Sequence, residues 1–166
     1  MLIGHFSAGY LAATAALRRT PPARRRALMT AALIGSVLPD LDLIYFYGVD
    51  SSVHHHALLP HWPLLWVAVL VASSLFSCNN GLSRWGHLGL ALGAAALLHC
   101  SLDSIAGSVR WLAPFSDHET TLVAVPPTHD SWILSFVTHW TFGLELAVVV
   151  AAAAVWWTQR RRARNP

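Results

Sequence analysis

The stretch ALLHCSLDSIAG, residues 96–107, closes an apolar run that begins near Trp85. His99 and Asp103 interrupt this run four positions apart, so they share one face of a helix with their side chains about one turn apart. A charged residue in a membrane-spanning helix is costly, by about 2.5–3.5 kcal/mol on insertion scales, so Asp103 should face the bundle interior and have a partner there. Two interpretations stay open: both side chains bind one metal ion, or they form a buried hydrogen bond that joins helices.

The composition favours a membrane protein. The chain has 166 residues, the length of a single domain, and 55% of them are hydrophobic. Its mean hydropathy of +0.48 is too apolar for an ordinary soluble domain. Only 11% of the residues are charged, yet ten histidines exceed the eight acidic residues. Because histidine commonly binds metals or moves protons near neutral pH, this excess points to a functional site.

Five apolar segments predict an all-α, polytopic membrane helical bundle with a metal site near its outer face. A bilayer core of about 30 Å needs about 20 helical residues, so the first and third segments are short for a full span. The membrane-embedded domain is predicted over residues 1–158, followed by a basic cytoplasmic tail over 159–166. The five segments cover residues 2–17, 27–47, 62–78, 86–107 and 132–157.

The arginines predict the topology. All eleven basic residues are arginines, and nine of them fall within 18–26 and 160–164. The positive-inside rule makes both clusters cytoplasmic, which five spans satisfy if the N-terminus is outside. The N-terminal apolar segment has no positive stretch before it, so we expect a retained first span and no signal peptide. Such clusters beside apolar spans are typical of membrane anchors, and we expect no nucleic-acid partner.

This topology places the candidate ligands on the outer side of the membrane and leaves only His87, among the histidines, on the inner side. Asp40 and Asp42 follow Pro39, which disturbs the helix and allows non-helical presentation of both carboxylates. Ligation and a solvated helix end are equally compatible with this pair. His5 lies at the start of an apolar helix, where a single histidine is more often an interfacial residue than a metal ligand. It is a candidate ligand because the other ligand-type residues are expected on the same side of the membrane. Four further imidazoles lie in HHHALLPHW, residues 54–62, where His54 and His55 are interpreted as merely polar.

The donor types indicate the chemistry. Histidine and aspartate without cysteine suit zinc, or a mixed nitrogen and oxygen site for manganese or iron. More than four candidate ligands imply two or more ions, and two ions about 3.5–4 Å apart can activate a water in phosphoester hydrolysis. Asp40, Asp42 and Asp103 are the candidate catalytic carboxylates. Arg110 is the candidate for binding a phosphate, with an interfacial anchor as its alternative role.

The order of these motifs resembles the YdjM-like family, described as LexA-binding, inner-membrane-associated, metal-dependent hydrolases. The resemblance covers about residues 3–117 and rests on GH at 4–5, LPDLD at 38–42, a His-x4-His element at 56–61, LLHCSLDSIAG at 97–107 and WLAPFSD at 111–117. It implies a distant similarity to zinc-dependent phospholipase C and the S1/P1 nucleases. It also implies a ligand set of His5, Asp40 or Asp42, His56, His61, His99 and Asp103. The loop departs from the family pattern at Ala57, Leu58, Pro60 and Trp62.

Two functions from different classes follow. The first is a membrane-bound metal-dependent hydrolase that acts on phosphate esters of lipids or other amphiphiles, which approach through the bilayer. The second is a transporter or an ion or proton pathway, because intramembrane histidine and acidic residues also line such pathways. Glu145 in the last apolar segment is the best support for the second function. A purely structural protein would not explain why so many ligand-type residues gather on one side.

Overall fold

The computed structural model describes residues 3–50, 55–78 and 83–164, and these residues confirm the predicted all-α fold. The described part contains no strand beyond one isolated bridge between Val109 and Thr120. The helical elements in chain order are α1 (Gly4–Ala16), α2 (Pro22–Gly35), η1 (Pro39–Leu41), α3 (Asp42–Gly48), η2 (His55–Ala57), η3 (Leu59–His61), α4 (Pro63–Cys78), α5 (Ser83–Ala106), α6 (Trp132–Val137) and α7 (Trp140–Arg164).

Each predicted apolar segment is helical, but two of them are broken. The segment predicted over 27–47 starts earlier, at Pro22, and bends by 47° between α2 and Pro39–Gly48. Pro39 explains the bend, because proline lacks the backbone N–H of a regular helix and clashes with the preceding turn. The last segment is interrupted between α6 and α7. Helix α7 then continues through the predicted basic tail to Arg164.

In the ranges that the structure describes, two helices, α5 and α7, are long and apolar enough to cross a membrane. The number rises to three if the bent pair of α2 and Pro39–Gly48 forms one span. Helix α4 is apolar but has only 16 residues, and α1 has 13. The apolar character is confirmed, whereas full spanning by five segments stays a prediction.

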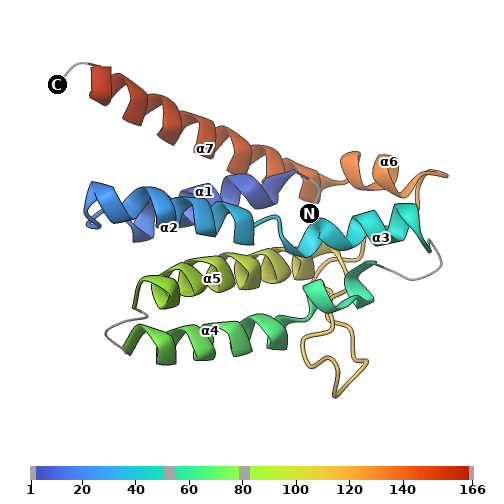
Figure 1. The fold of residues 1–166 in the computed structure, drawn as a ribbon. Coiled ribbons are helices and arrows are strands. Elements are labelled where there is room, and N and C mark those ends of the chain that lie inside the picture. The colour runs from blue at the N-terminus through green and yellow to red at the C-terminus, as the bar shows by residue number, and fades with distance from the viewer. Residues whose placement is uncertain (1–2, 51–54, 79–82, 165–166) are drawn as a thin grey trace.

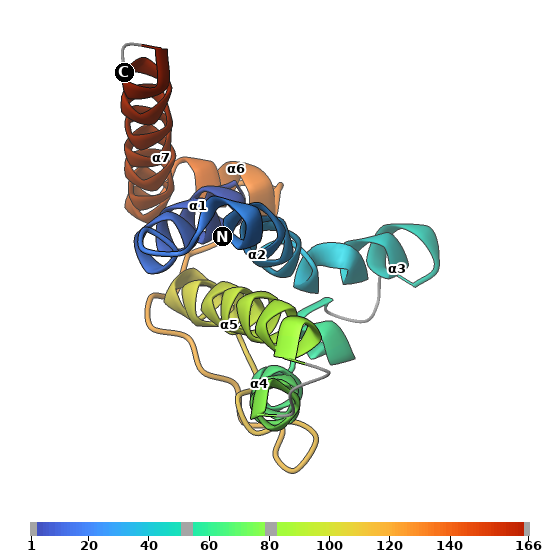
Figure 2. The ribbon, with the colours of Figure 1, turned by 60° about the vertical axis from the view of Figure 1, so that its left-hand side comes forward.

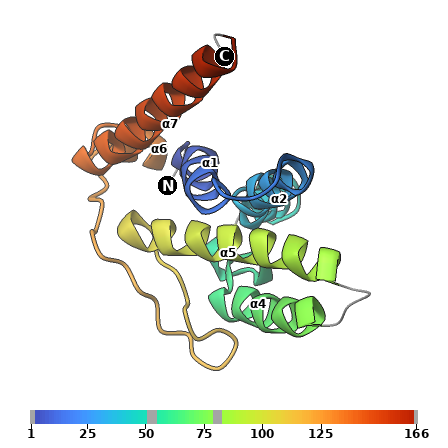
Figure 3. The same ribbon diagram turned by 90° about the vertical axis from the view of Figure 1, so that its left-hand side faces the viewer.

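Helix α5 lies at the centre of the bundle (Figures 1 and 3), with α4 on one side and α1 and α2 on the other. Helix α7 contacts α1 and then diverges from the other helices, as Figure 2 makes plain. The turn between α1 and α2 and the C-terminal end of α7 lie at the same end of the molecule, and α3 and α6 lie at the other. The arginine clusters and the histidine-rich elements therefore occupy opposite ends.

Small residues allow α2 to approach α5 closely. A Cβ atom on Gly35 would lie 2.1 Å from the carbonyl oxygen of Leu92, so only glycine fits there. Ala32 and Ala95 are also buried between these helices, and such small residues are typical of close helix packing in membranes. The approach matters for the site, because Ser36 directly after Gly35 makes a contact with His99 that is described below.

Gly35→Ala should therefore destabilise the protein. The added methyl group forces α2 away from α5, and such overpacking costs about 1–3 kcal/mol. Thermal unfolding of the detergent-solubilised protein measures the effect. Gly143→Ala is the matched control, because a Cβ atom at Gly143 meets nothing within 4 Å. Equal stability of the two variants would contradict the close contact.

Candidate metal centre

Seven side chains from six helical elements meet at the end of the bundle away from the arginine clusters. All of them except Asp40 are buried. We call this group the His/Asp cluster, and it consists of His5 from α1, Asp40 from η1, Asp42 from α3, His56 from η2, His61 from η3, and His99 and Asp103 from α5.

Asp103 lies at the centre of the His/Asp cluster. Its Oδ1 atom is 3.0 Å from Nε2 of His5, and the His5 ring stacks on that of His99 with centroids 3.6 Å apart. Its Oδ2 atom is 3.0 Å from Nε2 of His99, 3.3 Å from Nε2 of His61 and 3.8 Å from Nε2 of His56. The carboxylate thus contacts four imidazoles, which explains how an aspartate is accommodated in an apolar helix.

In three of these histidines, the second ring nitrogen, Nδ1, donates a hydrogen bond. Nδ1 of His99 donates to the carbonyl oxygen of Ser36 at 2.8 Å, and Nδ1 of His56 donates to that of Ser108 at 3.1 Å. Nδ1 of His61 donates to Oδ2 of Asp42 at 2.5 Å. A carbonyl oxygen can only accept, so these contacts fix the tautomer. In the neutral rings, each Nε2 atom then carries a lone pair directed toward Asp103.

Lone pairs of imidazole and carboxylate would repel one another at such distances, so the centre requires a positive charge. Nε2 of His99 and Nε2 of His61 are only 3.3 Å apart. Either protons or a metal ion can supply the charge. In the metal-free protein His61 holds such a proton. Burial lowers the pKa of His61, but hydrogen bonds to Asp103 and Asp42 outweigh burial and raise it from 6.5 to about 9.

The spacing of the donor atoms fits a metal ion. Oδ2 of Asp103 and the Nε2 atoms of His61 and His99 form a triangle with sides of 3.0, 3.3 and 3.3 Å. Zinc bonds of about 2.0–2.1 Å imply tetrahedral edges of about 3.3–3.4 Å. Three overlapping groups, each with donor atoms within 4.8 Å of one another, could hold an ion: His5, His99 and Asp103; Asp40, His61 and His99; and His56, His61 and Asp103.

The two aspartates after Pro39 face different partners. Oδ1 of Asp40 lies 3.6 Å from Nε2 of His99, on the side where the donor atoms meet, and its side chain is 30% exposed. Asp42 is buried and contacts His61 on the opposite edge of the ring, at Nδ1. Within the described part of the chain, Asp42 belongs to none of the three candidate metal groups. Asp42 therefore lies where it can orient the His61 ring for metal binding through Nε2.

The remaining predicted residues lie apart from the His/Asp cluster. The guanidinium group of Arg110, the predicted phosphate-binding residue, contacts Asp117 at 3.1 Å and Glu119 at 3.3 Å on the surface. His87 lies at the opposite end of α5, as the topology predicts. His54 and the side chain of His55 lie outside the described part of the structure.

Glu145 has a structural contact that the sequence does not reveal. It is completely buried, and its Oε2 atom accepts hydrogen bonds from the backbone N–H groups of Ile3 and Gly4 at 2.7 and 3.0 Å. A carboxylate at a helix N-terminus satisfies backbone donors and complements the helix dipole. Glu145 thereby holds the start of α1, one residue before His5, against α7.

A cavity of about 670 Å³ adjoins the His/Asp cluster. Asp40 and His56 line the cavity where it meets the cluster, so these two residues belong to both. The rest of the lining comes from α3, the end of α5, the segment that follows it, and α6. It is mainly apolar and aromatic, with Leu43, Phe46, Tyr47, Val125, Trp132 and Phe136 among its members.

The fold and the site together define a class: an all-helical membrane protein with a buried His/Asp cluster that could bind metal. The family model described as YdjM inner membrane protein matches residues 1–164, and the chain belongs to that family. This match confirms the resemblance seen in the sequence motifs and extends it over almost the whole chain. No match was found among curated proteins or among solved structures. The distant similarity to phospholipase C and the S1/P1 nucleases stays a prediction.

Proposed function

We propose that the His/Asp cluster binds one or two divalent metal ions and that the protein is a metal-dependent hydrolase of phosphate esters. The observation that carries the proposal is the convergence of three Nε2 atoms on Oδ2 of Asp103, at 3.0–3.8 Å, with each Nδ1 held by an acceptor. The donor set of imidazoles and carboxylates suits zinc best, with manganese or iron as alternatives.

The chain's own residues have distinct roles in this proposal. His5, His56, His61, His99, Asp103 and Asp40 hold the metal. A bound divalent cation of this kind makes water a nucleophile near neutral pH and neutralises charge on a phosphate oxygen. Metal uptake would release the proton held by His61, because a ligating imidazole must be neutral. Asp42 positions His61 through Nδ1. Asp40, which is partly exposed to the cavity, is placed to accept a proton from water or to contact the substrate.

The cavity beside Asp40 and His56 favours an amphiphilic substrate. Its volume of about 670 Å³ accommodates an organic group of moderate size, and its lining of aromatic and aliphatic side chains suits an apolar portion. The apolar surface nearby, including Ile44 at 70% and Tyr47 at 65% exposure, would contact lipid. We therefore propose phosphate esters of lipids or similar amphiphiles, with the phosphate directed toward the His/Asp cluster.

The proposal is tested with the purified full-length chain in detergent. After chelator treatment and addition of zinc, manganese or iron(II), it should hydrolyse bis(p-nitrophenyl) phosphate, p-nitrophenyl phosphate or a short-chain phospholipid. Chelator should abolish turnover and metal should restore it. Asp103→Asn should be inactive, which excludes a contaminating phosphatase. Metal binding without turnover of any of these esters would contradict the hydrolase assignment and leave the metal site intact.

We further propose that the cluster faces the periplasm or cell exterior, with the arginine-rich end in the cytoplasm, because arginines accumulate on the cytoplasmic side. A membrane-impermeant maleimide should label Asp117→Cys in intact cells, since the Asp117 side chain is 94% exposed near the cluster end. Wild-type Cys78, exposed at the arginine-rich end of α4, should react only after permeabilisation, and Cys100 is buried. Labelling of Cys78 in intact cells, with protection of the thiol introduced by Asp117→Cys, would reverse the orientation.

A further inference from the structure

Charge is strongly segregated between the two ends of the molecule. The sequence contains no acidic residue within 1–39, 51–102 or 146–166, although these ranges hold ten of the eleven arginines. The remaining one, Arg110, pairs with Asp117 and Glu119 at the other end. The arginines near the turn between α1 and α2 therefore lie in a part of the sequence that offers them no carboxylate.

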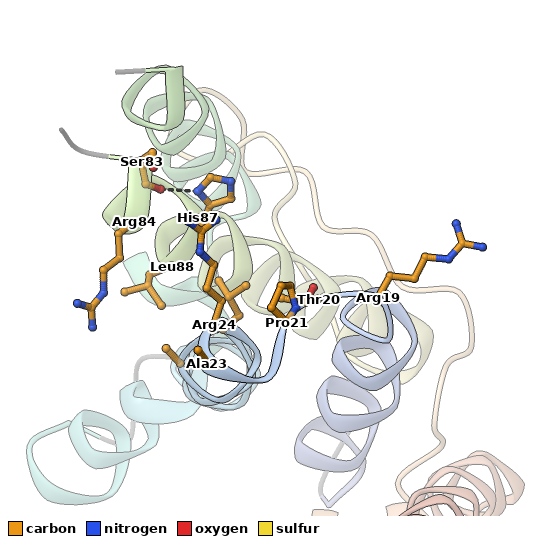
Figure 4. A pocket seen from close by; sticks show the side chains of 11 residues that line it. Arg19, Thr20, Pro21, Ala23, Arg24, Ser83, Arg84, His87 and Leu88 are labelled. Atoms are coloured by element: carbon orange, nitrogen blue, oxygen red, sulfur yellow. Dashed lines mark hydrogen bonds between the residues drawn. The ribbon is translucent and has the colours of Figure 1, made fainter. Parts of the chain in front are cut away.

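A second cavity, of about 640 Å³, lies at this arginine-rich end. It is formed by the turn between α1 and α2, the first two turns of α2 and the start of α5 (Figure 4). Its polar lining consists of Arg19, Thr20, Arg24, Ser83, Arg84 and His87. Among the residues that the structure describes, no acidic side chain lines it. Ala27, Leu28 and Leu88 add apolar surface to the lining.

The arrangement of the side chains brings cationic groups together. Figure 4 shows Arg24 extending from α2 toward His87 on α5, with Arg84 at the rim, whereas Arg19 points away. Nδ1 of His87 donates to the carbonyl oxygen of Ser83. The first turns of α2 and α5 also border the cavity, and helix N-termini favour anions. The arginines and the helix N-termini of the described lining thus favour an anionic ligand.

We propose that this cavity binds a phosphate group, carried by the headgroup of an anionic phospholipid. Guanidinium groups bind phosphate oxygens in a bidentate manner, and hydroxyl groups such as those of Thr20 and Ser83 complete such sites. Basic pockets between membrane helices on the cytoplasmic side are suited to anionic headgroups. The apolar wall formed by Leu28 and Leu88 suits the part of the lipid that follows the phosphate. Arginines that only fix the orientation of the helices in the membrane would not need to line a cavity.

Native mass spectrometry of the full-length protein in a neutral detergent tests the proposal by titration with phosphatidylglycerol or phosphatidylcholine. The wild-type protein should bind one phosphatidylglycerol with clear preference over phosphatidylcholine. The double substitution Arg24→Gln with Arg84→Gln should weaken this binding about tenfold or more, since it removes two guanidinium groups that line the cavity and would contact the phosphate. Arg18→Gln with Arg26→Gln is the matched control: it removes the same charge from positions outside the cavity.

The control pair should change the affinity by less than about twofold, given that it removes no group from the cavity. Equal losses in both pairs would overturn the proposal, as would the absence of any preference for phosphatidylglycerol. If the Gln pair is unstable by circular dichroism, Arg24→Lys with Arg84→Lys keeps the charge but loses the bidentate contacts. It should bind phosphatidylglycerol more weakly than the wild type and still prefer it over phosphatidylcholine, and loss of that preference would contradict an electrostatic site. Added inorganic phosphate distinguishes the ligand source. Displacement of the lipid indicates a site for phosphate itself, and persistence indicates recognition of the whole headgroup.

Discussion

Asp103→Asn should reduce the zinc retained by the purified protein to about one tenth of the wild-type amount or less, because it removes the charge at the centre of the ligand set. The carboxylate of Asp103 belongs to two of the three candidate metal groups, and its Oδ2 atom lies 3.0 and 3.3 Å from the two imidazoles of the third. Asparagine has nearly the same shape, and the helical fold should survive. Metal analysis and circular dichroism of the same preparation measure the two effects.

Asp117→Asn is the control for this change, because it makes the same substitution at a side chain that is 94% exposed and outside the His/Asp cluster. It should retain wild-type zinc. Zinc content in Asp103→Asn equal to that of the control would show that Asp103 is not a ligand. The buried contacts of Asp103 would then be a hydrogen-bonded helix junction.

Asp42→Asn should weaken zinc binding by about 10–100-fold without abolishing it, the usual loss for a residue that orients a metal-binding histidine. Asp42 contacts Nδ1 of His61 and lies outside the three groups of donor atoms found in the described part of the chain. The amide oxygen of asparagine can still accept a hydrogen bond from Nδ1, but the neutral amide no longer raises the basicity of the ring. Competition with a chromophoric zinc chelator gives the dissociation constant.

The metal bound at saturating zinc distinguishes the two variants. Saturating zinc should restore bound metal in Asp42→Asn and fail to do so in Asp103→Asn. If Asp42→Asn cannot be saturated, Asp42 binds the metal directly, as one interpretation of the sequence allowed.

The helices were largely predictable because their apolar runs are long and bounded by prolines, arginines and polar loops. The breaks were harder to predict. Pro39 indicated the bend after α2, whereas the break between α6 and α7 lies at Thr138 and His139, which carry no glycine or proline signal. The approach of α2 to α5 at Gly35 depends on tertiary contacts and was not visible in the sequence.

The site was predictable where spacing within one helix decides it, as for His99 and Asp103. His5, His56 and His61 came from motif order, because their proximity depends on the packing of separate elements. The different positions of Asp40 and Asp42 follow from the turn at Pro39, which the sequence left open. The carbonyl groups of Ser36 and Ser108 could not be predicted, since every residue has one. Glu145 suggested an ion pathway, but its carboxylate binds the start of α1.

The metal content of the wild-type protein shows whether the His/Asp cluster binds metal. The full-length chain is purified without chelators, supplied with zinc, passed through a desalting column and analysed by inductively coupled plasma mass spectrometry. About one or two zinc ions per chain are expected, because the site holds four imidazoles and the carboxylates that accompany them. A folded preparation that holds less than about a tenth of a zinc, manganese or iron ion per chain would contradict a metal site with these ligands.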